Sequence, residues 1–231
     1  MIQISNLSKK YGETVVFSDL NYTFENACIY GLVGRNGAGK TTLLNILSNY
    51  DKNYTGVISI DRKKMNKIDY LDMPVAYAMD QPSFFNELTI YENLLLIASS
   101  RKIKKQEAFD KIERILDGLG LKKYENYSPL ELSKGTMQRL NNACAMIQEE
   151  KITIFDEPFS GLDPVQMKLL ENVIVEFHKK EKGIYIISSH DIECLQNVCD
   201  KCLLLHNGQI REINIEEVDR EEIAKILSEG E

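Results

Sequence analysis

The sequence predicts an α/β fold in which a mixed, largely parallel sheet carries a phosphate-binding loop, and three observations support this prediction. Glycine-rich residues 34–42 lie between an apolar run typical of a buried strand and a run with helical spacing of apolar residues. Residues 151–213 alternate between strand and helix patterns. Residues 1–26 read as short strands and residues 88–150 as helices, so we expect an N-terminal antiparallel β subdomain and an α-helical subdomain beside this core.

Composition and charge favour one globular domain that does not bind nucleic acid. The chain has 231 residues, of which 43% are hydrophobic and 27% charged, as in ordinary globular proteins. We find no internal repeat or linker, and we expect a single domain over residues 1–231 with a helical insertion at about 86–150 and an acidic C-terminal helix at about 214–231. The formal net charge of −7 disfavours broad contact with nucleic acid or anionic lipid.

Several features predict a cytoplasmic location. No N-terminal signal pattern is visible, and the apolar run at residues 94–98 is far too short to span a bilayer. The odd number of cysteines, five, indicates reduced thiols. Cys199 and Cys202 have the C-x-x-C spacing of metal and redox sites, but a single pair without a second one favours ordinary packing.

The first eighty residues predict strands around one helix. The helix is expected at residues 42–48. The strands are expected within residues 1–26, joined by a polar turn at 9–13, and at residues 28–33, 54–60 and 75–79. Residues 66–69 match the N-K-x-D pattern with which GTPases read guanine, but here the pattern lies in a basic loop at the wrong point of the chain, so we interpret it as solvated surface.

Residues 88–213 predict helices followed by alternating strands and helices. Thr89 and Glu92 have the S/T-x-x-E spacing of a capping box and should begin a helix. Further helices are expected at residues 104–119, at 140–149 after an opening segment at 133–140, and at 166–180. Strands are expected at residues 152–155, 184–187, 202–205 and 209–213, the last two forming a hairpin around residues 206–208.

The glycine-rich segment has the pattern G-x-x-x-x-G-K-[ST] between a strand and a helix, which is the context that a phosphate-binding loop needs. Its backbone N–H groups and the helix N-terminus converge on an anion. We expect Lys40 to reach the β- and γ-phosphates and the Thr41 hydroxyl to bind Mg²⁺. The residues expected to hold the nucleotide are Gly34, Arg35, Asn36, Gly37, Ala38, Gly39, Lys40, Thr41 and Thr42. The segment therefore indicates a P-loop NTPase core.

Further polar residues end predicted strands, and the carboxyl ends of parallel strands line the ligand crevice of such sheets. Asp156 can hold Mg²⁺ directly or through water, and Glu157 is the candidate that polarises the attacking water. Gln81 can bind a metal or water and His190 can bond a γ-phosphate oxygen, although taken alone each is better explained as a satisfied structural residue. Tyr11, at a turn ahead of the loop, either stacks on a purine or covers the sheet edge.

Together these residues resemble the nucleotide-binding domain of the ABC transporter family, and the resemblance covers nearly the whole chain. Residues 34–42 look like the Walker A loop, and residues 152–157 look like Walker B with its catalytic glutamate. Gln81 resembles the Q-loop glutamine, residues 160–163 the D-loop, and His190 the switch histidine. Six ordered motifs at family-like intervals make the resemblance specific.

Residues 132–136 resemble the signature motif of the family, Leu-Ser-Gly-Gly-Gln, with two departures. Lys134 replaces the first glycine and Thr136 replaces the glutamine, while Ser133 and Gly135, which the family uses against the γ-phosphate, are present. Lys134 either adds a positive charge near the phosphates or faces solvent. Similar lysine-bearing signatures occur in bacterial exporters of peptides and drugs, so the resemblance implies an exporter.

The resemblance implies an ATPase subunit that binds ATP and Mg²⁺ and powers a separate membrane permease from the inner face of the membrane. Two subunits, identical or different, would pair head to tail, with each ATP between one Walker A loop and the Ser133 and Gly135 of the other chain. The permease would dock on the helical segment after Gln81, where Phe84 and Phe85 either contact it or pack internally.

The resemblance also assigns the site residues. Catalysis would use Lys40, Gln81, Glu157 and His190, and the adenine would stack on Tyr11. The ligands implied for Mg²⁺ are Thr41, Gln81 and Asp156.

Three other functions fit parts of the sequence. An ABC ATPase without a permease, acting in assembly or regulation, would share every motif. A DNA-handling or translation-factor ABC protein is disfavoured by the acidity of the chain and by its lack of a long coiled-coil insertion or a second cassette. A GTPase or kinase is disfavoured by the misplaced residues 66–69 and by the signature segment.

Overall fold

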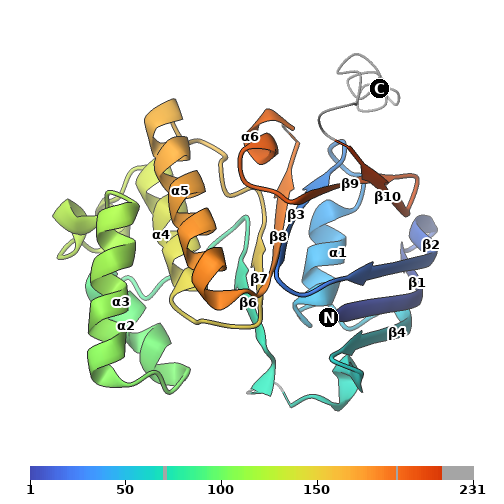
Figure 1. The fold of residues 1–231 in the computed structure, drawn as a ribbon, viewed down its shortest axis with the longest axis horizontal. Helices are drawn as coiled ribbons and strands as arrows, with labels where there is room; N and C mark the ends of the chain where they lie inside the picture. Colours follow the sequence, from blue (N-terminus) through green and yellow to red (C-terminus); the bar gives the residue numbers. More distant parts are fainter. Residues whose placement is uncertain (70–71, 191, 215–231) are drawn as a thin grey trace.

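The computed structural model of the chain describes residues 1–69, 72–190 and 192–214 (Figure 1). The acidic helix expected at about 214–231 falls on residues 215–231, outside the described ranges. None of the helices within these ranges combines the length and the apolar character that a membrane span requires.

The described strands form two sheets. The strands are β1 (Ile2–Tyr11), β2 (Thr14–Phe24), β3 (Cys28–Val33), β4 (Thr55–Ile60), β5 (Lys63–Lys64), β6 (Val75–Ala78), β7 (Ile152–Phe155), β8 (Ile184–Ser189), β9 (Lys201–His206) and β10 (Gln209–Ile213). The first sheet is antiparallel, in the order β2-β1-β4-β5. The second has the order β10-β9-β3-β8-β7-β6 and is parallel except for β10 at its edge. These sheets, with the helices below, confirm the predicted fold class.

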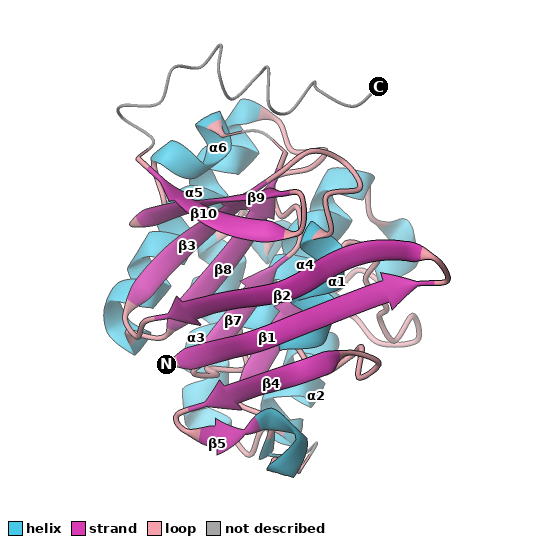
Figure 2. Ribbon diagram, turned by 90° about the vertical axis from the view of Figure 1, so that its right-hand side faces the viewer, coloured by secondary structure: helices cyan, strands magenta, loops and turns pink. Residues whose placement is uncertain are grey.

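The helices cover both faces of the six-stranded sheet. They are α1 (Lys40–Leu47), α2 (Ile90–Ser100), α3 (Lys105–Gly118), α4 (Lys134–Met146), α5 (Pro164–Glu181) and the short α6 (Glu193–Gln196). Helix α1 lies between the two sheets, whereas α2 to α5 lie on the opposite side of the six-stranded sheet (Figure 1). The antiparallel sheet covers α1 from outside (Figure 2).

Apolar packing explains this layered arrangement. Every residue of β3, β7 and β8 is buried, as expected for parallel strands that are covered on both faces. One core cluster joins α1, through residues such as Leu43 and Leu44, to both sheets. A second cluster joins the far face of the six-stranded sheet to α2, α3, α4 and α5. The two clusters fix which side of the sheet each helix occupies.

The parallel strands bring the predicted functional residues to one edge of the sheet. In the register of this sheet, Val33 of β3 pairs with Ser189 of β8, and Phe155 of β7 pairs with Ile187 of β8. The residues that follow these strands therefore emerge side by side. They are the phosphate loop after β3, Asp156 and Glu157 after β7, and His190 after β8.

Most expected elements are present, but three predictions about their limits were wrong. The N-terminal strands are long, because β1 continues through Tyr11 and β-bulges accommodate its polar residues, so the turn is only at Gly12 and Glu13. Helix α4 begins at Lys134 rather than Leu140, because the Ser133 side chain caps its first turn. It also ends at Met146, before Glu149, which has a φ of +53°. The short elements β5 and α6 were not expected.

Candidate nucleotide-binding and catalytic site

The phosphate loop joins the end of β3 to the start of α1. Gly37 and Gly39 adopt φ values of +80° and +99°, which favour glycine. A β-carbon on Gly39 would lie 2.7 Å from Val16 Cγ1 and 3.0 Å from the ring of Phe17, so a larger residue does not fit there. The turn is closed by a hydrogen bond from the Ala38 N–H to the Arg35 carbonyl, of 3.1 Å. The loop is thus shaped by its glycines and by its packing on β2.

Lys40 begins α1 and folds its side chain back over the loop. Its Nζ donates a hydrogen bond of 2.7 Å to the Gly34 carbonyl and lies 3.6 Å from Oε1 of Glu157. The Lys40 side chain is only 7% exposed, so its charge acts in a partly desolvated site where electrostatic interactions are strengthened.

The Glu157 carboxylate lies between two residues predicted to act in catalysis, Lys40 and His190. Its Oε2 lies 2.9 Å from Nδ1 of His190, while its Oε1 faces Lys40. Its backbone has a φ of +49°, unusual for a residue with a β-carbon. The Glu157 N–H donates to Oγ of Ser188 at 2.9 Å. The structure therefore brings together Lys40, Glu157 and His190 from three parts of the chain.

Asp156 lies beneath this group and is almost completely buried. Its Oδ1 accepts a hydrogen bond of 2.6 Å from Ser188 Oγ, and its Oδ2 lies 3.4 Å from the Tyr77 hydroxyl. Burial raises the pKa of the Asp156 carboxyl, and hydrogen bonds from Ser188 and Thr41 offset this rise only in part. Burial and the nearby Asp156 carboxyl also raise the pKa of the Tyr77 hydroxyl.

The donor chemistry of this corner fits Mg²⁺. The Thr41 hydroxyl bonds the Asp156 carboxylate, so a hydroxyl oxygen and a carboxylate oxygen lie close together beside the phosphate loop. Mg²⁺ prefers oxygen ligands of this kind and commonly binds through one or two carboxylates plus phosphate oxygens.

A cavity of about 530 Å³ opens over the loop. Its lining comprises Tyr11, Thr14, Val16, Arg35, Asn36, Gly37, Gly39, Lys40, Thr41, Thr42, Asp80 and Glu157. Nine of these residues were expected from the sequence, whereas the expected loop residues Gly34, which is buried, and Ala38, which is partly buried, are not part of the lining. Thr14, Val16 and Asp80 were missed, as was Ser188. Their positions in the sequence could have indicated them. Thr14 and Val16 follow the turn after Tyr11, and Asp80 and Ser188 lie near the ends of β6 and β8.

Tyr11 contributes to the wall of the cavity. Its ring is 52% exposed, and its hydroxyl donates to Oδ2 of Asp51 at 3.1 Å. The buried Lys9 Nζ lies 4.5 Å from the ring centroid and 2.7 Å from Oδ2 of Asp51. The Tyr11 ring is therefore held from one side by a cation and a carboxylate, and it lines the cavity with its remaining surface.

Besides Gly34 and Ala38, five predicted site residues of the described chain do not line this cavity: Asp156 and His190, which adjoin or contact Glu157 as described above, and Gln81, Ser133 and Gly135. Gln81 is exposed, and its neighbour Asp80 contributes to the lining instead. Ser133 and Gly135 lie at the start of α4, where the Ser133 hydroxyl accepts a hydrogen bond from the Thr136 N–H. Lys134 is exposed to solvent at this helix start.

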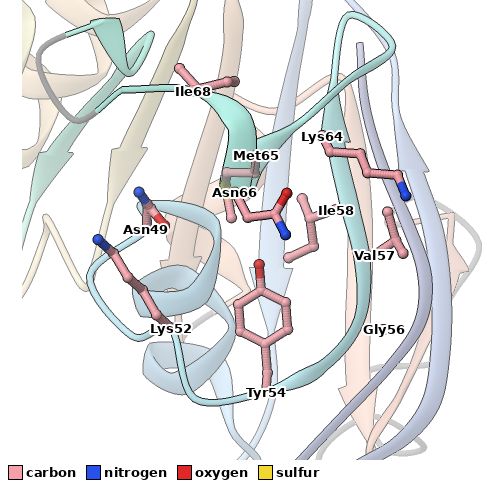
Figure 3. Close-up of a pocket in the computed structure, with 10 residues that line it drawn as sticks. All are labelled: Asn49, Lys52, Tyr54, Gly56, Val57, Ile58, Lys64, Met65, Asn66 and Ile68. Carbon is pink, nitrogen blue, oxygen red and sulfur yellow. The ribbon is translucent and has the colours of Figure 1, made fainter.

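A second cavity, of about 300 Å³, lies beyond the other end of α1 (Figure 3). Figure 3 shows Lys52 and Lys64 on opposite sides of it, so their charges do not converge on one ligand. None of the described residues lines both cavities. Asn66 borders this second cavity, and Asn66, Lys67 and Asp69 are exposed, in agreement with a solvated surface loop at residues 66–69.

The C-x-x-C pair packs into the core. Cys202 is buried on β9, and Cys199 packs against the larger core cluster. Burial raises the pKa of both thiols, to about 12 for Cys202, which disfavours the reactive thiolate.

Comparison with known proteins gives the same assignment for the chain as a whole. A family model described as ABC transporter matches residues 17–160. The chain is 32% identical to the uncharacterized ABC transporter ATP-binding protein MJ1023 of Methanocaldococcus jannaschii, over 90% of this chain and 75% of that protein. It is 31% identical to the bacitracin transport ATP-binding protein BcrA of Enterococcus faecalis, over 95% of this chain and 71% of that protein.

Solved structures share the fold. A structure described as the ATP binding subunit of an ABC transporter superposes with a TM-score of 0.85 at 27% identity, covering 98% of this chain and 94% of that chain. The dimeric cassette MJ0796, bound to ADP and Pi, superposes with a TM-score of 0.82 at 22% identity, covering 93% of this chain and 99% of that chain. The family model spans most of the chain and the relatives span nearly all of it, so the chain belongs to the ABC transporter family as an ATP-binding, ATP-hydrolysing protein.

Proposed function

We propose that ATP binds in the cavity between Tyr11 and the phosphate loop and is hydrolysed there with Glu157 as the residue that activates water. One observation carries this proposal: the Glu157 carboxylate lies 3.6 Å from Lys40 and 2.9 Å from His190 at the wall of the cavity. A carboxylate between a cation and an imidazole can accept a proton from water while its neighbours contact the phosphate. The adenine would stack on Tyr11, which is largely exposed and lines the same cavity.

The proposed reaction is in-line attack of water on the γ-phosphorus. The water oxygen forms the new bond to phosphorus, the bond to the bridging oxygen breaks, and ADP leaves. Glu157 accepts the proton of the water, and His190 donates a hydrogen bond to a γ-phosphate oxygen. Lys40 and the loop N–H groups stabilise the developing charge. A bound Mg²⁺, held by Thr41 and Asp156 with Gln81 as a further oxygen ligand, would supply positive charge beside the β- and γ-phosphates.

We further propose that two subunits, identical or different, pair head to tail. Ser133 and Gly135 lie outside the cavity of their own chain but at the exposed start of a helix whose N–H groups can bind an anion. In the proposed dimer, this helix start faces the γ-phosphate in the other subunit. The related cassette MJ0796 is described as dimeric, which supports this arrangement.

Proteins of this family work with membrane permeases, and we propose that this chain lies on the cytoplasmic side of one. The docking surface would comprise Phe85, Tyr127 and Leu130, which are 59%, 45% and 74% exposed. The segments that carry these residues are tied together by a hydrogen bond of 2.8 Å from Ser128 Oγ to the Asn86 carbonyl. Phe84, for which the sequence left docking and internal packing open, packs against the core.

We propose export of peptides, drugs or similar compounds as the direction of transport. The lysine-bearing signature around Lys134 supports it, as does a relative named for bacitracin transport. Another relative, TupC of Peptoclostridium acidaminophilum, is named for tungstate uptake, so direction needs its own test. ATP-dependent accumulation of a labelled peptide inside inverted membrane vesicles would support export, and accumulation only in right-side-out vesicles would contradict it.

The permease assignment is tested by co-purification. The Glu157→Gln variant is solubilised from its native membranes with ATP, and proteins bound to it are identified. We expect a polytopic membrane protein among the bound proteins. The added substitution Phe85→Asp should abolish this binding, whereas the control substitution Val57→Ser, outside the proposed docking surface, should leave it unchanged. If the variant captures only water-soluble proteins or none, while the original protein hydrolyses ATP, the chain is instead an ABC ATPase without a permease, acting in assembly or regulation.

A further inference from the structure

Three amide side chains on α4 contact the backbone of the catalytic edge. The Gln138 Nε2 donates to the Glu157 carbonyl at 3.2 Å, and the Asn142 Nδ2 donates to the Pro158 carbonyl at 3.2 Å. The Asn141 Nδ2 donates to the carbonyl of Met79 at 2.7 Å. Residues 138, 141 and 142 have the spacing that places side chains on one face of a helix. This face of α4 therefore holds the segments that follow both β6 and β7.

Packing alone does not explain these amides. Asn142 is fully buried and Asn141 is 5% exposed, among the buried apolar residues Leu140, Ala143 and Ala145 of the same helix. Within the described residues, Oδ1 of Asn142 has no hydrogen-bond partner. A buried amide with one unpaired atom is less favourable than an apolar residue of similar size. The bond that Asn142 donates to Pro158 is what distinguishes it from such a residue.

Gln138 and Asn142 hold the carbonyls of two consecutive residues, Glu157 and Pro158, and the first of these has an unusual backbone geometry. Glu157, at φ +49°, adopts a conformation that persists only where surrounding contacts enforce it. Its N–H is bonded to Ser188, and its carbonyl accepts from both Gln138 and the Ser160 N–H. The amides thus complete the contacts that hold the Glu157 backbone.

Asn141 acts in the same way on the neighbouring strand. Met79 directly follows β6 and precedes Asp80, which lines the nucleotide cavity, and Gln81. The short bond from Asn141 to the Met79 carbonyl fixes the point at which the chain leaves the sheet. Displacement of α4 would therefore move Asp80 and Gln81 together with Glu157.

We propose that Gln138, Asn141 and Asn142 are positioning residues for ATP hydrolysis, which hold Glu157 and the Asp80–Gln81 segment in the geometry required for turnover. This inference rests on the proposed role of Glu157. Because Ser133 caps the start of α4, the amides also connect the helix start that would face a second subunit with the catalytic edge of this chain.

The variant Asn142→Leu tests this role, because leucine has a similar volume and suits a buried position. We expect kcat for ATP to fall by about tenfold to a hundredfold, as misplacement of catalytic groups does. The Kd for ATP should stay within about twofold of the original value, because the phosphate loop is unchanged. The melting temperature of the variant should change little. If Asn142 were only a structural residue, its substitution would lower the melting temperature and leave kcat of the folded protein unchanged.

Gln138 provides a second test that does not depend on the buried site. Gln138→Leu should lower kcat in the same way, and Gln138→Lys, which keeps a donor of similar reach, should restore most of the activity. Cys144→Ala, on the same helix but away from these bonds, serves as the control and should leave kcat within about twofold.

Glu157→Gln, measured alongside, distinguishes failure of the positioning role from failure of the proposed role of Glu157. If it is inactive while folded Asn142→Leu and Gln138→Leu hydrolyse ATP like the original protein, the positioning role is overturned and the role of Glu157 stands. If Glu157→Gln itself hydrolyses ATP normally, the role of Glu157 fails. Should Asn142→Leu not fold, Gln138→Leu and its lysine counterpart decide the question.

Discussion

Lys40 and Glu157 lie 3.6 Å apart with side chains that are 7% and 18% exposed. At such sites opposite charges attract more strongly than they do on the surface. A γ-phosphate bound to the loop would compete for Lys40 and leave a Glu157 oxygen available to water. At the scale of the residue, then, the same carboxylate can pair with the cation and serve as the base.

Lys9 supports the part of the cavity wall that Tyr11 forms. Its buried ammonium donates to the Asn53 carbonyl and pairs with Asp51, each at 2.7 Å. We predict that Lys9→Met lowers the free energy of unfolding by about 2 kcal/mol, because Asp51 and Asn53 lose a charged partner. Denaturant titration measures this loss. Exposed Lys10→Met is the matched control, and equal effects of the two variants would contradict the role of Lys9.

The contribution of Lys9 should depend on pH. Burial opposes the shift, but the bonds from Lys9, the Asn53 N–H and Tyr11 together lower the pKa of Asp51. A carboxyl whose pKa is lowered in the folded state stabilises above its unfolded pKa, and this stability is lost as the pH falls through the folded pKa. The stability difference between the original protein and Lys9→Met should therefore shrink below about pH 4. If this stability difference is unchanged at about pH 3, the variant loses packing and not an ion pair.

Local pattern was sufficient to predict the turn at residues 34–42, because the spacing of its glycines defines that turn. It was insufficient for Ser188 and Asp80, since neither belongs to a contiguous motif with Lys40. They join the site only because β6, β7 and β8 are neighbours in the sheet. Which carbonyls Gln138 and Asn142 would reach was equally hidden, because it depends on how α4 packs on that sheet.

Among the elements, α3 is tied to the rest of the fold by a buried charge. The Lys111 Nζ, on a side chain only 1% exposed, lies 2.6 Å from Oε1 of Glu149 and 3.3 Å from Oε1 of Glu181 at the end of α5. The Tyr185 hydroxyl of β8 also donates to Glu181, at 2.6 Å. These contacts connect the helical region to the six-stranded sheet.

We predict that Lys111→Met lowers the free energy of unfolding by about 3 kcal/mol, because two carboxylates lose a buried partner. The exposed pair of Lys151 and Asp61 gives the comparison, and Lys151→Met should change stability by less than about 1 kcal/mol. Equilibrium unfolding in urea measures both. Similar values for the two variants would show that the Lys111 cluster is not a significant tie.

Element limits were less predictable than element types. The capping box at Thr89 and Glu92 is present, because capping depends on residues close in sequence. The hairpin around residues 206–208 is also present, with positive φ at Asn207 and Gly208. The start of α4 was misjudged because the polar residues after Ser133 hide a helical face that only the packed sheet reveals.

At the scale of the whole molecule, α1 and α4 pack on opposite faces of the six-stranded sheet (Figure 1). This separation explains why Ser133, at the start of α4, lies outside the cavity above α1. The layered fold follows from apolar patterning, which the sequence displays. The relation of the helix start to a nucleotide does not, because in the proposed dimer it is made between two molecules.

Calorimetric binding of ATP together with steady-state turnover of Glu157→Gln tests the proposed catalytic role of Glu157 most directly. We predict that the variant binds ATP with nearly the original Kd, since the loop and Tyr11 are intact, and that its turnover falls by about a thousandfold. Lys40→Ala is the companion variant and should lose affinity, because the phosphates lose its charge. Turnover by Glu157→Gln close to that of the original protein would contradict the catalytic role of Glu157, because the carboxylate between Lys40 and His190 would then have no part in hydrolysis.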